Sequence, residues 1–163
     1  MTKDQFKHCF DQYFDQLRNY IYYRCGDEER ASDIAQESFM KIWEKDIDFD
    51  ENKVKGLLYH IAKQLWISQY RKKESEKKYE LSLTFKPSSD NPDETLEYQE
   101  LKNNYEETLA ALPAKQREVF LMSRIDDLTY KEIAIRLEIS VKAIEKRMSL
   151  ALQELRKVLS NET

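Results

Sequence analysis

Residues 129–155 read TYKEIAIRLEISVKAIEKRMSLALQEL, and their apolar pattern predicts two helices joined by a short turn. Apolar residues recur at three- and four-residue steps on one face of each helix, namely Ile133 and Leu137, then Ile144, Met148, Leu152 and Leu155. Thr129 and Glu132 have the spacing of a capping box, and Ser140 is suited to cap the second helix. The stretch therefore predicts a helix-turn-helix, in which a short helix supports a longer one.

The longer helix has a polar outer face that carries basic side chains. The residues expected on this face are Lys142, Glu145, Lys146, Ser149 and Gln153, flanked by Arg124, Tyr130, Lys131 and Arg147. Basic and hydrogen-bonding side chains on the second helix of such a motif are suited to read the major groove of DNA. Lysines on an exposed helix face are also commonly just solvated. Periodicity alone leaves both interpretations open.

Composition restricts the fold to helices. Of 163 residues, 40% are apolar and 36% are charged, and the chain contains only two glycines and three prolines. Hairpins and tight turns between strands and helices use more of both residues. We therefore predict an all-α protein made of one or two small helical domains.

The sequence carries no pattern typical of a catalytic or metal site. Cys9 and Cys25 lie sixteen positions apart beside only two histidines, which predicts free thiols and neither a disulfide framework nor a zinc site. Without a Gly-rich phosphate loop or a Ser/His/Asp or Cys/His set, we expect no enzyme activity, no cofactor and no metal. The N-terminus lacks a signal-peptide pattern, and no window approaches a membrane span. We expect a soluble, cytoplasmic protein.

Further periodic stretches predict the remaining helices. We expect them at about residues 4–24, 28–45, 53–79, 94–111 and 113–124. Gly26 is suited to the left-handed cap of the first helix. The stretch TFKPSSDNPD (84–93) has two of the three prolines and no periodicity, which is typical of a linker. We therefore predict a helical domain at 1–80, a flexible linker at 81–95 and a helix-turn-helix domain at 96–163.

Charge is distributed in blocks, although the chain carries a net charge of −4. Residues 26–52 contain ten acidic and three basic residues, whereas residues 60–78 contain six basic and two acidic ones. Surface charges interact over roughly 8–10 Å at physiological ionic strength, so local blocks matter more than the net charge. The acidic balance therefore does not exclude nucleic acid as a partner.

Three stretches of the chain match the patterns of one protein family. Residues 112–157, LPAKQREVFLMSRIDDLTYKEIAIRLEISVKAIEKRMSLALQELRK, resemble the promoter-reading C-terminal domain of bacterial RNA polymerase sigma factors. Residues 33–44, DIAQESFMKIWE, and 54–74, VKGLLYHIAKQLWISQYRKKE, are similar to consecutive segments of sigma domain two. Because only a short linker separates the two domains, the chain resembles the extracytoplasmic-function (ECF) group. The resemblance implies a factor that binds core polymerase and recognises the −10 and −35 promoter elements, without catalysis of its own.

In this family the acidic second helix docks on the β′ subunit of core polymerase. The resemblance implies that the docking residues here are Asp33, Ile34, Gln36, Glu37 and Phe39, with Trp43 behind them. Carboxylates and glutamine would pair with a basic partner, while an aromatic ring supplies buried area. Taken without the resemblance, this stretch also fits a solvated acidic helix face.

The resemblance implies that the third helix holds the opened −10 element. The residues assigned to −10 DNA are Tyr59, Lys63, Gln64, Arg71, Lys72 and Lys73. Basic side chains would neutralise phosphates, and an aromatic ring would stack on an unpaired base. Tyr59 and Trp66 are both candidates for this ring, and both also fit the core. Leu57, Gln64 and Ser68 differ from the residues that many family members carry, which leaves the −10 sequence preference open.

The helix-turn-helix is implied to read the −35 element. The residues assigned to −35 DNA are Arg124, Tyr130, Lys131, Lys142, Glu145, Lys146, Arg147 and Ser149. Glu145 can accept a hydrogen bond from a cytosine amino group and so select sequence, or it can pair with Lys142 or Arg147. The resemblance also implies an anti-sigma partner and a monomer in the free state.

Two other functions fit the helix-turn-helix considered by itself. A stand-alone transcriptional regulator would dimerise on half-sites about one DNA turn apart, and a helical interaction protein would have no DNA role. The segment DIAQESFMKIW (33–43), joined to a distal helix-turn-helix, favours the sigma factor, because a repressor has no use for that segment.

Overall fold

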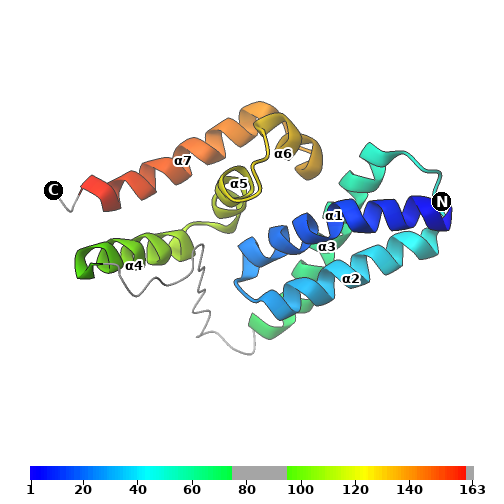
Figure 1. The fold of residues 1–163 in the computed structure, drawn as a ribbon, viewed down its shortest axis with the longest axis horizontal. Helices are drawn as coiled ribbons and strands as arrows, with labels where there is room; N and C mark the ends of the chain where they lie inside the picture. The colour runs from blue at the N-terminus through cyan, green and yellow to red at the C-terminus, as the bar shows by residue number, and fades with distance from the viewer. Residues whose placement is uncertain (75–94, 161–163) are drawn as a thin grey trace.

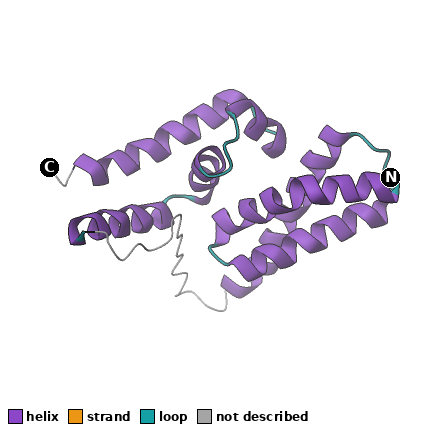
Figure 2. Ribbon diagram, in the orientation of Figure 1, coloured by secondary structure: helices purple, strands orange, loops and turns teal. Residues whose placement is uncertain are grey.

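The described part of the chain folds into seven α-helices, as the sequence predicted. A computed structural model describes residues 1–74 and 95–160, with the backbone alone at 70–74 and 159–160. The helices are α1 (Lys3–Cys25), α2 (Glu28–Lys45), α3 (Glu51–Glu74), α4 (Leu96–Ala111), α5 (Ala114–Arg124), α6 (Tyr130–Leu137) and α7 (Val141–Ser160). They form an N-terminal group, α1 to α3, and a C-terminal group, α4 to α7 (Figures 1 and 2).

Helices α1, α2 and α3 form a three-helix bundle. α1 and α2 run antiparallel side by side, and α3 packs against both (Figure 1). Gly26 allows the sharp reversal between α1 and α2 because its φ of 71° is left-handed, a conformation that glycine adopts without strain. Asp27 then begins α2 by accepting a hydrogen bond from the Arg30 amide at 3.2 Å. The core draws apolar side chains from all three helices, among them Leu17, Ile21, Ile34, Phe39, Ile42, Val54 and Leu58.

The C-terminal group is built around α5 and the helix-turn-helix. α5 contacts α6 and α7, α4 packs along α7, and α6 packs against α7. The predicted capping box is present, since Thr129 Oγ1 accepts from the Glu132 amide at 3.1 Å and Glu132 Oε1 accepts from the Thr129 amide at 3.2 Å. Glu138 ends α6 in a left-handed conformation with φ 55°. Ser140 Oγ then begins α7 by accepting from the amide three residues later at 3.1 Å.

Most predicted helix ends agree with the structure to within one or two residues. The helix predicted at 53–79 begins at Glu51, and its predicted end lies beyond the described residues. The predicted linker at 81–95 lies almost wholly outside them too, so the domain division stays a prediction. Cys9 and Cys25 are buried free thiols, as expected. Within the described ranges, no helix is long and apolar enough to cross a membrane.

The two groups of helices pack directly against each other, an arrangement that the sequence left open. α1 contacts α5, and α3 contacts α6. The physical reason lies in the run Val119–Met122, which is apolar over a full helical turn and wholly buried. A helix that is apolar on every side has to be covered on every side. α1 covers the part of α5 that the other helices of the C-terminal group leave exposed.

Candidate polymerase and nucleic-acid interfaces

The outer face of α2 presents acidic, polar and apolar side chains together. Asp33 and Gln36 are exposed, and Glu37 is half-buried with its Oε2 accepting a hydrogen bond from a glutamine of α3 at 3.2 Å. Further along this face, Met40 is 61% exposed and Trp43 is 41% exposed. Large apolar side chains left in solvent and rimmed by polar groups are typical of a protein-docking surface.

Two residues that the sequence assigned to this surface are buried instead. Ile34 and Phe39 are 2% and 1% exposed because both point into the three-helix bundle, so their assignment to direct contact is wrong for this conformation. Trp43, expected behind them, lies outside, with its ring centroid 5.0 Å from that of Phe6. The helical period predicts which of these residues are exposed and which are buried, because residues at three- and four-residue steps from Asp33 share its outer face.

Tyr59, assigned to −10 DNA, lies in the core. It is 2% exposed, its ring centroid is 5.0 Å from that of Tyr20 in α1, and the Arg136 side chain of α6 lies close to its hydroxyl. Burial raises the pKa of the phenol. A ring in this position cannot stack on a base, so the core interpretation of Tyr59 holds and the DNA assignment is wrong for this conformation.

The other α3 residues assigned to −10 DNA differ in their surroundings. Gln64 is exposed to solvent, whereas Lys63 is half-buried and faces the C-terminal group. The side chains of Arg71, Lys72 and Lys73 lie outside the described residues. The part of α3 that the structure describes is therefore open at Gln64 and covered near Lys63.

The outer face of α7 is fully accessible. Its exposed residues are Lys142, Glu145, Lys146 and Ser149, while Ile144, Met148, Ala151 and Leu155 on the other face are buried. Among the ion pairs of the described residues, none joins Glu145 to Lys142 or Arg147. The Glu145 carboxylate is thus free to accept a hydrogen bond from a base.

The flanking residues divide into two sets. Arg124 and Lys131 are exposed and Tyr130 is half-buried at the edge of the helix-turn-helix, and the Arg124 guanidinium carbon lies 5.8 Å from the centroid of the Phe120 ring. Arg147, in contrast, lines a cavity between the two groups of helices. Arg147 therefore does not share the outer face that carries the other predicted −35 residues.

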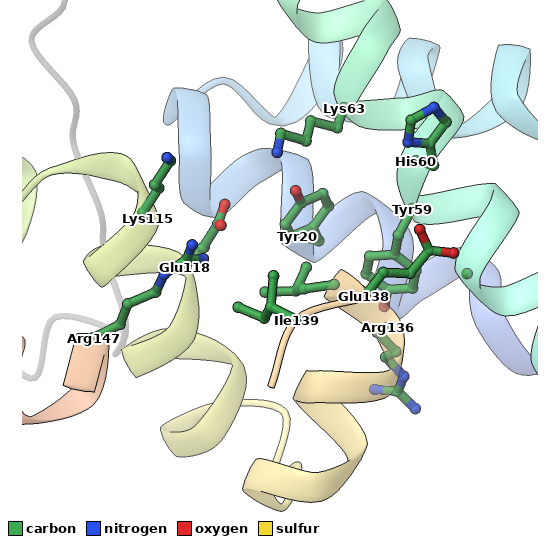
Figure 3. Close-up of a pocket in the computed structure, with 12 residues that line it drawn as sticks. Tyr20, Tyr59, His60, Lys63, Lys115, Glu118, Arg136, Glu138, Ile139 and Arg147 are labelled. Carbon is green, nitrogen blue, oxygen red and sulfur yellow. The ribbon is translucent and has the colours of Figure 1, made fainter. Parts of the chain in front are cut away.

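This cavity lies where α3, α5, α6 and α7 meet, and it holds about 90 Å³. Lys63 enters it from α3, Lys115 and Glu118 from α5, and Arg147 from α7 (Figure 3). Ligand pockets usually measure roughly 300–1,000 Å³, so the space between the groups is too small to admit a nucleotide strand.

One buried arginine joins the two groups at the end of α1. Arg117 of α5 is 3% exposed, and its Nε and Nη2 donate to the carbonyls of Tyr23 at 2.6 Å and Arg24 at 2.8 Å. Its Nη1 donates to the carbonyls of Ala110 at 3.0 Å and Leu112 at 2.8 Å. Burial lowers the pKa of Arg117 to about 10, which leaves the side chain charged at neutral pH. One cation thus caps the C-terminal ends of α1 and α4, where the helix dipoles favour positive charge.

A buried ion pair lies beside this arginine. Arg24 Nε of α1 is 3.0 Å from Glu118 Oε2 of α5, and their side chains are 8% and 3% exposed. Burial raises the pKa of Glu118 to about 7, and the raised value persists although several cations act in the opposite direction. These cations are Arg117 of the same helix and Arg24 of α1, Lys63 of α3 and Arg147 of α7.

Two further contacts join the groups on either side. Asp126, expected only as a turn residue, accepts hydrogen bonds at its Oδ1 from the Tyr23 hydroxyl at 2.9 Å and from Asn19 Nδ2 at 3.1 Å. On the other side, the Glu138 side chain touches α3 at Gly56, where a Cβ would lie 2.8 Å from Glu138 Oε1. The contacts between the two groups, which we call the junction, therefore extend from the end of α1 to the first turns of α3.

Sequence reasoning missed these interface residues because charged side chains were read as solvated. A usable signal was present at Arg117 and Glu118, which directly precede the apolar run of α5. A helix buried on all sides has no exposed face for charges, so they have to be paired. Nothing local to Tyr23 or Asp126 indicates their contact, because they are 103 residues apart.

Comparisons with known proteins match both groups of helices. The family described as Sigma-70 region 2 matches residues 9–76, and the family described as Sigma-70, region 4 matches residues 102–155. The ECF RNA polymerase sigma factor SigW of Bacillus subtilis (strain 168) is 30% identical, over 96% of this chain and 90% of that protein. The chain belongs to the ECF group of RNA polymerase sigma factors.

Other relatives agree with this assignment. The ferric citrate uptake sigma factor FecI of Escherichia coli (strain K12) is 30% identical over 76% of this chain and 72% of its own length. A solved structure of the sigma factor RpoE in complex with the anti-sigma factor NepR from Bartonella quintana has a TM-score of 0.64 and 23% identity, covers 98% of both chains, and shows the same fold. As a sigma factor, the protein directs promoter-specific transcription initiation by binding core polymerase. A stand-alone regulator would not account for the region 2 match.

Proposed function

We propose that the outer face of α2 is the surface by which this sigma factor binds the β′ subunit of core polymerase. Its members are Asp33, Gln36, Glu37, Met40 and Trp43. Docking would bury the two large apolar side chains while the carboxylates pair with a basic partner. Ile34 and Phe39 contribute indirectly, because they hold α2 in the bundle.

The outer face of α7 reads the −35 element. The observation that carries this assignment is the exposure of Lys142, Glu145, Lys146 and Ser149 on one face of a helix whose other face is buried. Lysine can bind guanine or phosphate, serine can bind several bases, and glutamate accepts from cytosine. Arg124, Tyr130 and Lys131 at the edge of the motif are placed to bind backbone phosphates, which position the helix without reading sequence.

α3 holds the single-stranded −10 element. Gln64 and Lys63 supply a hydrogen-bonding group and a cation, joined by Arg71, Lys72 and Lys73 of the same helix. Basic side chains along one helix neutralise phosphates and bind single strands with a marked salt dependence. Tyr59 supports this helix from the core.

The sigma factor acts by binding and carries out no chemistry of its own. In the part of the chain that the structure describes, no group of three His, Cys, Asp or Glu side chains could hold a metal ion. Its partners are core polymerase, promoter DNA and an anti-sigma protein, and the free chain is a monomer. The fold shared with a sigma factor solved together with the anti-sigma factor NepR supports the anti-sigma partner.

Run-off transcription on a library of random promoters, with core polymerase in the presence and absence of this protein, tests the proposal. We expect specific initiation only when both are present. The double variant Lys142→Ala/Lys146→Ala should lose most of it, whereas Lys3→Ala/Lys7→Ala, an equal change of charge at exposed positions of α1, should not. Failure of the wild-type protein to increase initiation on any promoter would overturn the proposal.

A further inference from the structure

Three cations from three different helices meet at one end of the cavity between the two groups. Lys63 enters it from α3, Lys115 from α5 and Arg147 from α7, and their side chains point toward one another (Figure 3). Among the described residues, none of the three forms an ion pair with an acidic side chain. Like charges in a partly enclosed space repel one another, because little water is present to screen them. A negative group at this place would relieve the repulsion.

The acidic side chains of the cavity do not balance these cations. Glu118 is 3% exposed, and its Oε2 lies 3.0 Å from Arg24 Nε, so its charge is already shared with a fourth cation. Burial also raises the pKa of Glu118 to about 7, so a proton neutralises about half of this charge at neutral pH. The other acidic side chain of the lining, Glu138, lies against α3 at Gly56. The cavity therefore has an excess of positive charge.

Buried donors in the cavity wall also lack partners. Tyr59 is 2% exposed and Arg136 is 7% exposed, and both line the cavity. Among the described residues, neither the Tyr59 hydroxyl nor Arg136 Nη1 has a hydrogen-bond partner of normal geometry. Buried polar groups are nearly always hydrogen-bonded, and each exception calls for an explanation. Spare donors beside an excess of cations indicate a site for an acceptor that carries negative charge.

We propose that the cavity is a binding site for a small tetrahedral oxyanion of the phosphate type, which Lys63, Lys115 and Arg147 hold through charge-assisted hydrogen bonds. Such bonds are about twice as strong as neutral ones, and lysine and arginine are both common ligands of phosphate. A cavity needs about 10–15 Å³ to hold one water molecule, so about 90 Å³ has room for a phosphate-sized group. The proposal does not depend on the assignment of α3 to the −10 strand.

Two sources of this chemistry fit the cavity. Inorganic phosphate fits as a whole. A nucleotide is too large, but Lys115 is exposed, so the cavity is open to solvent on that side. The terminal phosphoryl group of a nucleoside diphosphate can therefore enter while its base stays outside.

Two cations of the cavity lie outside the surfaces proposed above, and single variants of these two test the site. Lys115→Gln and Arg147→Gln each remove one charge and keep a polar side chain. The matched controls are Lys7→Gln, at an exposed position of α1, and Arg156→Gln, at an exposed position of α7. Because Lys115 is exposed, its replacement leaves the packing of α5 intact. Melting followed by circular dichroism shows whether Arg147→Gln, at a half-buried position, also keeps the fold.

A third variant should strengthen binding. Glu118→Gln removes a negative charge that lies among the cations and keeps the shape of the side chain. An anion bound elsewhere on the surface would respond little to this change, because Glu118 is buried. A gain in Glu118→Gln together with a loss in Lys115→Gln would therefore place the anion in the cavity.

The measurement is isothermal titration calorimetry of the full chain without polymerase, at neutral pH and constant ionic strength, with inorganic phosphate and with GDP in separate titrations. We expect the wild type to bind phosphate, Lys115→Gln and Arg147→Gln to bind it about tenfold more weakly, and Glu118→Gln about threefold more tightly. Both controls should match the wild type. The melting temperature of the wild type should rise with phosphate, because a ligand of the folded state stabilises that state. The ligand that binds more tightly identifies the source of the phosphoryl group.

Three results would overturn the proposal. Absence of binding by the wild type up to about 10 mM phosphate or GDP would exclude the anion site. A loss in Lys115→Gln no larger than the loss in Lys7→Gln would show that phosphate binds elsewhere. An equal rise of the melting temperature in chloride at matched ionic strength would show a general effect of salt. None of these results bears on promoter recognition, because the assay contains neither polymerase nor DNA.

Discussion

Replacing Arg117 should uncouple the two groups of helices. Arg117→Met keeps most of the apolar stem and the length of the side chain but removes all four hydrogen bonds of the guanidinium. Two of the carbonyls that lose their donor belong to the end of α1, and the other two lie at the end of α4. The Glu118 carboxylate also loses a neighbouring cation.

The expected loss of stability is large because these groups are buried. Hydrogen bonds to a charged group contribute about 1.5–3 kcal/mol each, but they share one side chain and do not add fully. Breaking a buried charged network from one side usually costs about 3–5 kcal/mol, and we expect a value in this range. That is a substantial part of the roughly 5–15 kcal/mol that stabilises a typical domain. The melting temperature should fall by roughly 6–20 °C.

Urea unfolding followed by two probes can detect the uncoupling as well as the loss. Both tryptophans, Trp43 and Trp66, lie in α2 and α3, so their fluorescence reports on the N-terminal group. Circular dichroism reports on helices of both groups. In the wild type the two transitions should coincide, whereas in Arg117→Met the dichroism should begin to fall before the fluorescence changes.

A matched control and two outcomes make this prediction refutable. Arg156→Met makes the same change at an exposed position of α7 and should shift stability by no more than about 0.5 kcal/mol. A loss in Arg117→Met below about 1 kcal/mol would show that the four hydrogen bonds contribute little net stability. A large loss with coincident transitions would show that Arg117 does not couple the groups.

Three further results are expected. Because the folded protein holds the Glu118 proton with a pKa of about 7, above its value in the unfolded chain, the free energy of unfolding should fall by about 1.5 kcal/mol as pH rises from about 5.5 to 7. Glu118→Gln should abolish this slope in chemical denaturation, and an unchanged slope would exclude Glu118 as its cause. Trp43→Ala should weaken binding to core polymerase by about 2 kcal/mol in a titration, while Leu96→Ala, which truncates a 71% exposed side chain on α4, should not. Lys146→Ala should reduce the salt dependence of −35 binding by about one unit, and a slope shared with Lys7→Ala would remove Lys146 from the interface.

Much of the fold could be predicted because helices follow local rules. The capping box at Thr129 and the left-handed cap at Gly26 each depend on residues within one turn, and both are present. The exposed polar face of α7 could also be predicted, since Lys142 and Lys146 lie opposite a continuous apolar stripe. Where the prediction failed on α2, the residues Ile34 and Phe39 had been assigned by resemblance, and the helical period would have placed them inside.

The contacts between the groups could not be predicted in this way. Asp126 had the appearance of a turn residue, and its bond to Tyr23 requires both groups to be folded and docked. Tyr59 was compatible with both a DNA-facing and a buried position, because an aromatic residue on an amphipathic helix fits either. Its neighbours Tyr20 and Arg136 come from helices distant in the chain, and they place it in the core.

The sequence by itself therefore determined the seven helices, the helix-turn-helix and the family, because periodicity, capping and motif spacing are properties of neighbouring residues. Only the tertiary structure decided that the two groups of helices close on each other. The closure depends on Arg117 and Glu118, whose charges become costly or stabilising only when other helices remove them from water. A sequence does not show whether a charged side chain will be buried, and for this reason the contacts between the two groups became visible only in the folded chain.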